Sequence, residues 1–166
     1  MNAMMEEVQF RPMRRFKQAV GDEDCWRVLA DVKRGVLSVR GDGGYPYGVP
    51  INFIADEAEK TLYVHCAREG HKIDAIRRDA RVCFTAWRET RKDEDGWSWH
   101  VESVIAFGRA ELVEDPGLTL AVARQLGLRY FPDEAEVEAV LARSLSHVQI
   151  IAIHIDHLTG KRIHEK

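Results

Sequence analysis

The residues best suited to chemistry lie between Tyr63 and Asp79, where the sequence reads YVHCAREGHKIDAIRRD. A short apolar segment that ends at His65 predicts a buried strand. Gly70 then precedes a helix whose first turn carries His71 and Lys72. A helix start has unpaired backbone N–H groups and the positive end of the dipole, so it suits an anion, especially a phosphate. The spacing therefore favours a phosphate site, although a polar surface that simply opens a helix would have the same residues.

A second unusual stretch lies upstream, where residues 45–53 read YPYGVPINF. It is an apolar strand that holds two prolines and a glycine, which is rare inside a sheet unless another group takes up the backbone. Proline and glycine also bare backbone groups and allow a close approach to the main chain. This stretch is therefore a candidate binding surface.

Histidine and cysteine near the loop raise the question of a metal. His65 and Cys66 are consecutive on a strand, so their side chains point to opposite faces and cannot easily share one ion. The cysteines are odd in number, lack CxxC spacing and lie among apolar residues, which indicates buried free thiols. The spacing of the C-terminal histidines indicates no site, and we predict no metal centre. The residues concerned are Cys25, Cys66 and Cys83, and His154, His157 and His164.

Length and composition predict one globular domain over residues 1–166, with residues 1–13 as an N-terminal tail. Hydrophobic residues make up 45% of the chain and charged residues 31%, as in ordinary globular proteins. A net charge of −3 argues against nucleic-acid binding, which requires a basic face. No apolar run reaches the roughly 18 residues of a membrane span, and no signal-peptide core is present, so we expect a cytoplasmic protein that binds no membrane.

Six apolar segments at short spacing predict strands, at residues 36–39, 47–55, 60–65, 81–87, 97–113 and 148–155. Helices are expected from Asp22 to a C-terminal Gly35, after Gly70, from Pro116 to Leu126, and from 134 to 144 behind an Asp133 cap. In the first of them, Trp26, Leu29 and Ala30 share one face. The pattern is typical of a mainly β fold, a six-stranded antiparallel barrel with peripheral helices.

The connections carry further expectations. Residues 41–44 and 56–59 predict hairpin turns, and Gly108 predicts a bulge or a close approach of two backbones. The charged run from Arg88 to Gly96 predicts a solvated hairpin tip. Residues 159–161 predict a turn that ends the chain.

Four segments in order, GVLSV, GGYPYGVPINF, LYVHCAREGHKIDAIRRDARVCFTAW and ESVIAFGRAEL, resemble the FMN-binding split barrel of the pyridoxamine 5'-phosphate oxidase superfamily. The similarity covers residues 14–161. The sequence is most similar to the branch of Nim-type 5-nitroimidazole reductases, whose characteristic motifs are close to YGVPVN followed by HCAxxGxK. The resemblance implies FMN as the cofactor and a homodimer with the flavin at the interface.

The resemblance also implies a set of cofactor contacts. The flavin ring lies along the second barrel strand and its neighbour, the phosphate meets the helix start, and one contact comes from the partner subunit. For His71 two roles stay open: a cation beside the phosphate when protonated, or a residue at the substrate cavity. The implied residues are Val49, Pro50, Ile51, Asn52, His65 and Cys66 for the ring, His71 and Lys72 for the phosphate, and Ser103 for the partner contact.

The expected activity is the reduction of small electrophilic molecules such as nitroimidazoles and nitroaromatics, with NAD(P)H or another reductant. Pyridoxamine phosphate is not expected as the substrate, because Val49 and Ile54 replace basic residues and the arginine-rich C-terminal signature is missing. No Ser-His-Asp triad or carboxylate pair is recognisable, and flavin chemistry needs none. The alternatives are a non-catalytic flavin- or haem-binding sensor or store, and a cofactor-free dimerisation domain.

One strand predicts the dimer surface. Apolar side chains alternate along it and offer more apolar surface than one small barrel needs, although they would also serve as monomer core. They are Trp97, Trp99, Val101, Ile105 and Phe107.

Overall fold

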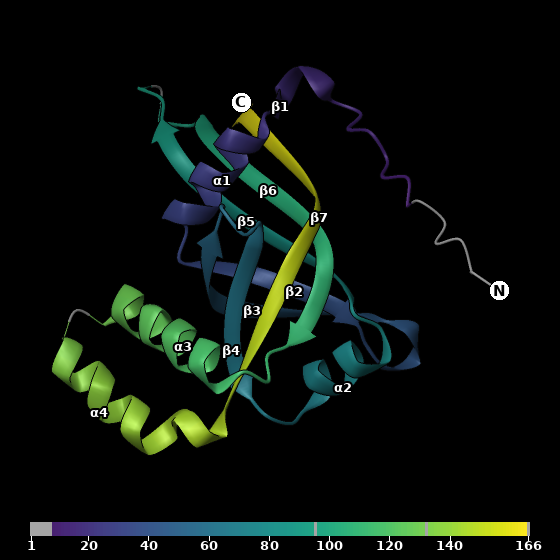
Figure 1. Cartoon of the computed structure of the whole chain (residues 1–166). Coiled ribbons are helices and arrows are strands. Elements are labelled where there is room, and N and C mark those ends of the chain that lie inside the picture. The colour runs from purple at the N-terminus through teal and green to yellow at the C-terminus, as the bar shows by residue number, and fades with distance from the viewer. Residues whose placement is uncertain (1–7, 95, 132, 166) are drawn as a thin grey trace.

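Six antiparallel strands form a closed barrel in the computed structural model, which describes residues 8–94, 96–131 and 133–165 (Figure 1). Hydrogen bonding runs in the order β7-β4-β3-β2-β5-β6, and β6 pairs back to β7. A two-residue strand, β1 (Ala19–Val20), pairs with β7 outside this ring. The predicted six-stranded antiparallel barrel is confirmed, whereas residues 1–7 of the expected tail lie outside the described residues. The barrel strands are β2 (Arg34–Arg40), β3 (Pro46–Asp56), β4 (Thr61–Ala67), β5 (Arg81–Lys92), β6 (Trp99–Leu112) and β7 (Val148–Glu165).

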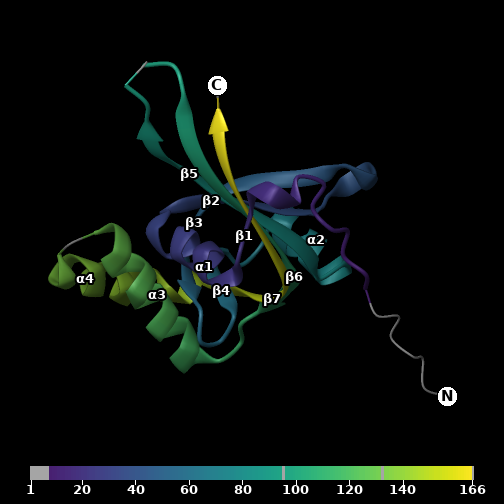
Figure 2. The same cartoon turned by 90° about the horizontal axis from the view of Figure 1, so that it is seen from above.

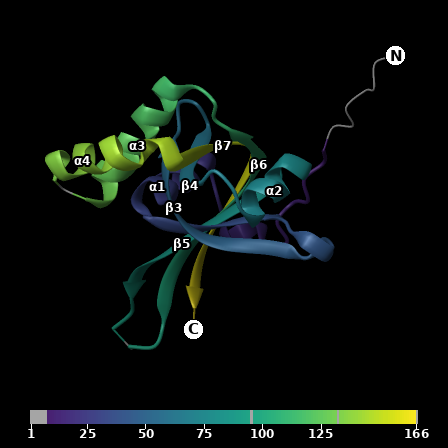
Figure 3. The same cartoon turned by 90° about the horizontal axis from the view of Figure 1, so that it is seen from below.

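Four α-helices surround the barrel: α1 (Asp22–Asp31), α2 (His71–Arg78), α3 (Pro116–Tyr130) and α4 (Glu134–Ser144). Short 3-10 turns add η1 (Phe16–Gln18), η2 (Asp42–Gly44) and η3 (Leu145–His147). Helices α3 and α4 form a hairpin on one side of the barrel, and α2 lies on the other side (Figures 1 and 3). Among the described helices, none combines the length and the apolar character that crossing a membrane requires.

Two apolar layers hold these elements together. The first fills the barrel and includes the buried faces of α1 and α2, with Phe53 and Phe84 in edge-to-face contact at 4.7 Å between ring centroids. The second lies between α3 and the outer face of β7, where Leu126 packs near Ile150. Around Tyr63 of β4 and residues 150–153 of β7 the sheet is therefore covered on both faces, which excludes water from the backbone hydrogen bonds there.

Strand β7 closes the barrel, because residues 148–154 pair with β4 while residues 151–165 pair with β6. The β6–β7 register shifts between Phe107 and Gly108. A Cβ atom added at Gly108 would lie 2.3 Å from the carbonyl oxygen of His154. The predicted bulge and close approach at Gly108 are both confirmed.

One sequence expectation about a turn is wrong. Residues 159–161 do not end the chain in a turn but continue β7, opposite residues 103–105 of β6. The glycine there is required by packing, since an added Cβ at Gly160 would lie 2.4 Å from the Cys25 sulfur. The solvated hairpin tip is confirmed, since most described residues of the charged run are exposed at the end of the β5–β6 hairpin. Strand β5 itself continues to Lys92, and Arg88 forms an ion pair with buried Glu102.

The first helix also differs from expectation. Its N-cap is Gly21 rather than Asp22, which instead lies in the first turn, where a carboxylate favours the helix dipole. The helix ends at Asp31, and Gly35 belongs to β2, packed against the Phe84 ring. Ala30 is exposed, so the buried face consists of Cys25, Trp26, Val28 and Leu29.

We predict that Gly108→Ala destabilises the protein by about 1–3 kcal/mol, because the new methyl group must push β7 away from β6. Gly117→Ala is the control, since Gly117 lies in the first turn of α3, where alanine is favoured by up to about 1 kcal/mol. Urea unfolding of the three proteins measures the difference. Equal midpoints for Gly108→Ala and the parent would show that the strands are not in tight contact.

Candidate functional site

The outer face of β3 and β4 carries the candidate ring contacts. Strand residues alternate between faces, so the four consecutive residues expected at the ring divide into two pairs. Ile51 packs against the barrel core, and Val49 shares its face. Pro50 and Asn52 point outward instead. Only these two can offer side chains to a ligand on the outside of the barrel.

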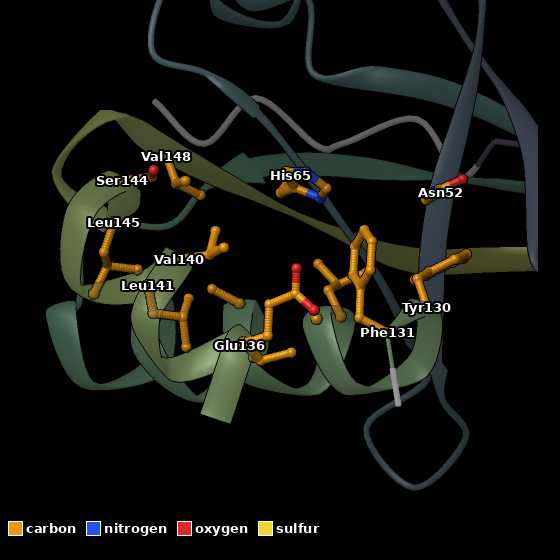
Figure 4. Close-up of a pocket in the computed structure, with 14 residues that line it drawn as sticks. Asn52, His65, Tyr130, Phe131, Glu136, Val140, Leu141, Ser144, Leu145 and Val148 are labelled. Atoms are coloured by element: carbon orange, nitrogen blue, oxygen red, sulfur yellow. The ribbon is translucent and has the colours of Figure 1, made fainter. Parts of the chain in front are cut away.

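His65 lies beside Asn52. The β3–β4 register pairs Phe53 with Val64, so Asn52 and His65 are the next two residues to face each other along the antiparallel strands. Both line a cavity of about 210 Å³ between the sheet and the α3–α4 hairpin (Figure 4). Phe131 and Val140 give the cavity an apolar wall, and the Glu136 carboxylate points into it from α4. The sequence-predicted residues Asn52 and His65 thus form one wall of an apolar pocket.

Tyr130 fixes the position of this pocket. Pairing between β2 and β3 ends at Arg34 and Asn52, which leaves one edge of Phe53 without a strand. The Tyr130 hydroxyl takes the place of that strand: it accepts from the Phe53 N–H at 3.0 Å and lies 3.0 Å from the Phe53 carbonyl oxygen. It also contacts the carbonyl of Lys33. These backbone contacts dock the end of α3 onto the barrel and hold the pocket open below it.

Lys72 reaches toward β4 rather than into solvent. Burial raises the pKa of the Cys66 thiol, although the nearby Lys72 acts in the opposite direction. The protein around the His65 ring lowers the pKa of that imidazole, and the charge of Lys72 lowers it further. Lys72 therefore brings one cation next to a neutral histidine and a protonated thiol.

The start of α2 is open to an anion. Its N-cap is Gly70, with φ of 122°, a conformation that side-chain-bearing residues rarely adopt. Within the described residues no side chain caps this turn, so its first backbone N–H groups remain available. The predicted helix start is confirmed, and its geometry is compatible with phosphate binding.

The side chain of His71 points away from this anion position. Consecutive helical residues point about 100° apart, and here His71 turns to the β2–β3 hairpin. Its ring stacks on Tyr47 with centroids 4.1 Å apart, and its Nε2 accepts the Asp42 N–H at 3.3 Å. The Asp42 carboxylate in turn pairs with Arg78 at 2.7 Å. The structure thus brings Lys72 together with His65 and Cys66, and separates the side chain of His71 from that group.

Ser103 lies far from the other candidate residues within one chain. It pairs with Lys161 on β7, whereas His65 pairs with Ile150, eleven residues earlier on the same strand. That separation corresponds to roughly 35 Å of extended strand. Along the strand Ser103 is thus well separated from the other candidate residues, as expected of a residue that the resemblance assigns to the partner subunit.

Sequence reasoning did not identify the pocket residues on α3 and α4. Pro116 and the Asp133 cap predicted both helices, and the carboxylates of Asp115 and Asp133 each accept a backbone N–H. What the pattern did not reveal is that the helix pair folds onto β3 and β4. The available signal was Tyr130, an aromatic residue with a polar group at the end of an amphipathic helix, a residue type that needs a hydrogen-bond partner when buried.

The sequence and the fold are both similar to those of known proteins. A family model described as pyridoxamine 5'-phosphate oxidase matches residues 21–162. No curated protein matches the sequence.

Several solved structures share the fold. A candidate 5-nitroimidazole antibiotic resistance protein from Bacteroides thetaiotaomicron superposes with a TM-score of 0.73 at 21% identity, covering 89% of this chain and 87% of the other. A conserved hypothetical protein from Mycobacterium tuberculosis gives 0.72 at 19% identity, with 87% of each chain covered. An FAD-binding protein from Mesorhizobium loti gives 0.61 at 20% identity, over 87% of this chain and 96% of the other. At these identities the likeness establishes the split-barrel fold.

The effect of the Lys72 charge on the cavity wall can be tested by measuring the pKa of His65. We predict that His65 titrates below its ordinary value of 6.5, so protonating it costs stability as the pH falls below that value. Lys72→Met removes the neighbouring cation and should raise the pKa of His65, whereas Lys60→Met, at the other end of β4, should not. NMR titration of the imidazole protons measures both. A pKa above 6.5 in the parent protein would contradict the described environment.

Proposed function

The chain belongs to the pyridoxamine 5'-phosphate oxidase family, and from this premise we propose that it binds FMN and reduces small electrophilic molecules such as nitroimidazoles or nitroaromatics. The observation that carries the proposal is the position of Lys72, at an uncapped helix start and next to the pocket wall that holds His65. The fold neighbours described as an FAD-binding protein and as a candidate nitroimidazole resistance protein support it.

The residues present fit the cofactor. A flavin requires a flat slot for its ring, donors for its pyrimidine edge and cations for its phosphate. Lys72 and the first N–H groups of α2 would hold the phosphate, while Pro50 and His65 would border the ring. Arg34 donates to the Asn52 side-chain carbonyl at 3.2 Å, which leaves the Asn52 amide N–H₂ as a donor. When bound, the flavin supplies electron or hydride transfer, and NAD(P)H is the proposed reductant.

The cavity favours a small, uncharged substrate. Among the described residues that line it, none is lysine or arginine, and the one charged side chain is Glu136. A phosphorylated substrate such as pyridoxamine phosphate would find no counter-ion there and would face a carboxylate. A cavity of about 210 Å³ with an apolar wall suits a single aromatic or nitro-heterocyclic ring.

We also propose a homodimer. The outward side chains of β5 and β6 form an apolar face around Ser103, where Trp87 is 54% exposed, Ile105 39% and Phe107 37%. Trp97, which precedes β6, is 87% exposed. Phe10 packs on Phe107, with ring centroids 5.4 Å apart, but the other apolar residues remain exposed. Apolar residues gathered on an exposed sheet face favour a self-complementary contact. In such a dimer Ser103 of each copy can reach the flavin of the other.

A second candidate function is non-catalytic binding of flavin or haem, in a sensor or a store. The observation that favours it is His65, whose lowered pKa keeps the imidazole neutral at an apolar cavity, as a haem ligand requires. The visible spectrum separates the candidates. A flavin band near 450 nm that bleaches when NAD(P)H is added under anaerobic conditions supports the reductase. An unchanged flavin band, or a Soret band after haem addition, supports the alternative, and a colourless protein that ignores FMN contradicts both.

We predict that Lys72→Ala weakens FMN binding about ten- to a hundredfold, the ~1.5–3 kcal/mol of a charge-assisted hydrogen bond. Riboflavin, which lacks the phosphate, should bind parent and variant about equally. Arg77→Ala is the matched control, because Arg77 is exposed on the same helix and pairs with Asp74. Quenching of flavin fluorescence gives the affinities. An unchanged FMN affinity for Lys72→Ala would move the phosphate site elsewhere.

We predict that Ile105→Arg converts a dimer into monomers, since it buries a charge at the centre of the proposed contact. Leu128→Arg is the control, because Leu128 is equally exposed on α3, away from that face. Light scattering at micromolar concentration gives the masses. A monomeric mass for the flavin-loaded parent would overturn the proposed dimer.

A further inference from the structure

A second cluster of potential ligands lies at the end of the β5–β6 hairpin. Asp93, His100 and His164 present ligand atoms that all lie within 4.8 Å of one another. His100 Nε2 is 2.9 Å from Asp93 Oδ1, and His164 Nε2 is 2.5 Å from Asp93 Oδ2. Figure 2 shows the hairpin and the end of β7 extending together from the barrel. The sequence predicted no metal centre, and Asp93 and His164, which are 71 positions apart, come together only in the folded sheet.

The sheet itself builds this cluster. His100 and His164 are direct partners in the β6–β7 register, and their rings stack with centroids 4.2 Å apart. Asp93 follows β5, where its N–H donates to the Ser98 carbonyl at 2.8 Å and fixes the hairpin end. Three backbone segments therefore hold three side chains in place without a ligand. The cluster lies on the face of β6 that carries Glu102, opposite to the face of Ile105.

A positively charged side chain of the protein, Arg91, already lies against the cluster. The Arg91 guanidinium lies 2.9 Å from His100 Nε2 and 3.3 Å from Asp93 Oδ1. Imidazole nitrogens and carboxylate oxygens are also the groups that bind a metal ion, so Arg91 lies where it would compete with a bound ion. The Arg91 side chain is 70% exposed and can move into solvent when an ion replaces it.

We propose that Asp93, His100 and His164 bind a divalent transition-metal ion of the zinc type. Two imidazole nitrogens and one carboxylate are a common ligand set for Zn²⁺ and leave a coordination position for water. The side chains are 25%, 24% and 33% exposed, so an ion can enter from solvent. A bound ion would join the hairpin to the end of β7 and hold both in one position. Because the site lies outside the proposed flavin-binding residues, it does not depend on the proposed function.

Zinc titration tests the site directly. After chelator treatment and dialysis, the full chain is titrated with Zn²⁺ alone by calorimetry. We expect one ion per chain, and an affinity at least tenfold lower for His164→Ala and for Asp93→Asn, since even the loss of an indirect metal partner costs about 10- to 100-fold. His147→Ala, which removes an exposed histidine at η3, should bind as the parent does. Arg91→Gln should bind more tightly than the parent, because it removes the competing cation.

The Arg91 variant separates a metal site from a set of hydrogen bonds. If the cluster is only a hydrogen-bonded tie, Arg91→Gln leaves zinc affinity unchanged and the proposal fails. Absence of binding in the parent, or an equal loss in His147→Ala, also overturns it. Should His164→Ala fold poorly, Asp93→Asn keeps the shape of the side chain and still removes the anionic ligand. Absorption of a Co²⁺-loaded parent in the tetrahedral d–d region gives an independent readout of the coordination.

Discussion

Closure of the barrel by β7 is the constraint on which the other features depend. One strand of eighteen residues pairs with β4 at its start and with β6 along most of its length. It can serve both because Gly108 lets the two backbones approach and the register shift bends the strand. Closure removes open sheet edges from this part of the barrel. The candidate ligand sites accordingly lie outside the barrel core, against the helices and at the end of the β5–β6 hairpin.

The two ends of β7 then define two different regions. Near its start, β4 and β7 lie under the α3–α4 hairpin, where Tyr130 completes the open edge of β3 and shapes an apolar cavity. Near its end, β7 and β6 extend beyond the barrel core and carry Ser103 on one face and His100 on the other. In the proposed dimer the flavin contacts Lys72 of one copy and Ser103 of the other. The separation of these two residues along β7 within one chain is the physical argument for that proposal.

Much of the fold could be predicted from the sequence, because alternation, caps and turn residues act locally. What could not be predicted depends on contacts between distant segments. Gly160 looked like a turn signal, yet it lies inside β7. Glycine is needed there because the Cys25 sulfur fills the space that a side chain would take. The charged run from Arg88 was correctly predicted to be a solvated hairpin tip, but the ion pair of Arg88 with buried Glu102 depends on the neighbouring strand. The motif that suggested a phosphate site located Lys72 correctly at the helix start, but the direction of His71 depended on a hairpin that packs beside it.

The central claim, a flavin site shared by two subunits, is tested most directly by a heterodimer of two impaired chains. One chain carries Lys72→Glu, which places a negative charge at the proposed phosphate position, and the other carries Ser103→Glu at the proposed partner contact. Each homodimer should then bind FMN weakly, while the co-purified heterodimer contains one intact site made of Lys72 from one chain and Ser103 from the other. The account predicts that the heterodimer regains parental FMN affinity at about one flavin per dimer. A heterodimer that binds no better than either homodimer would contradict it.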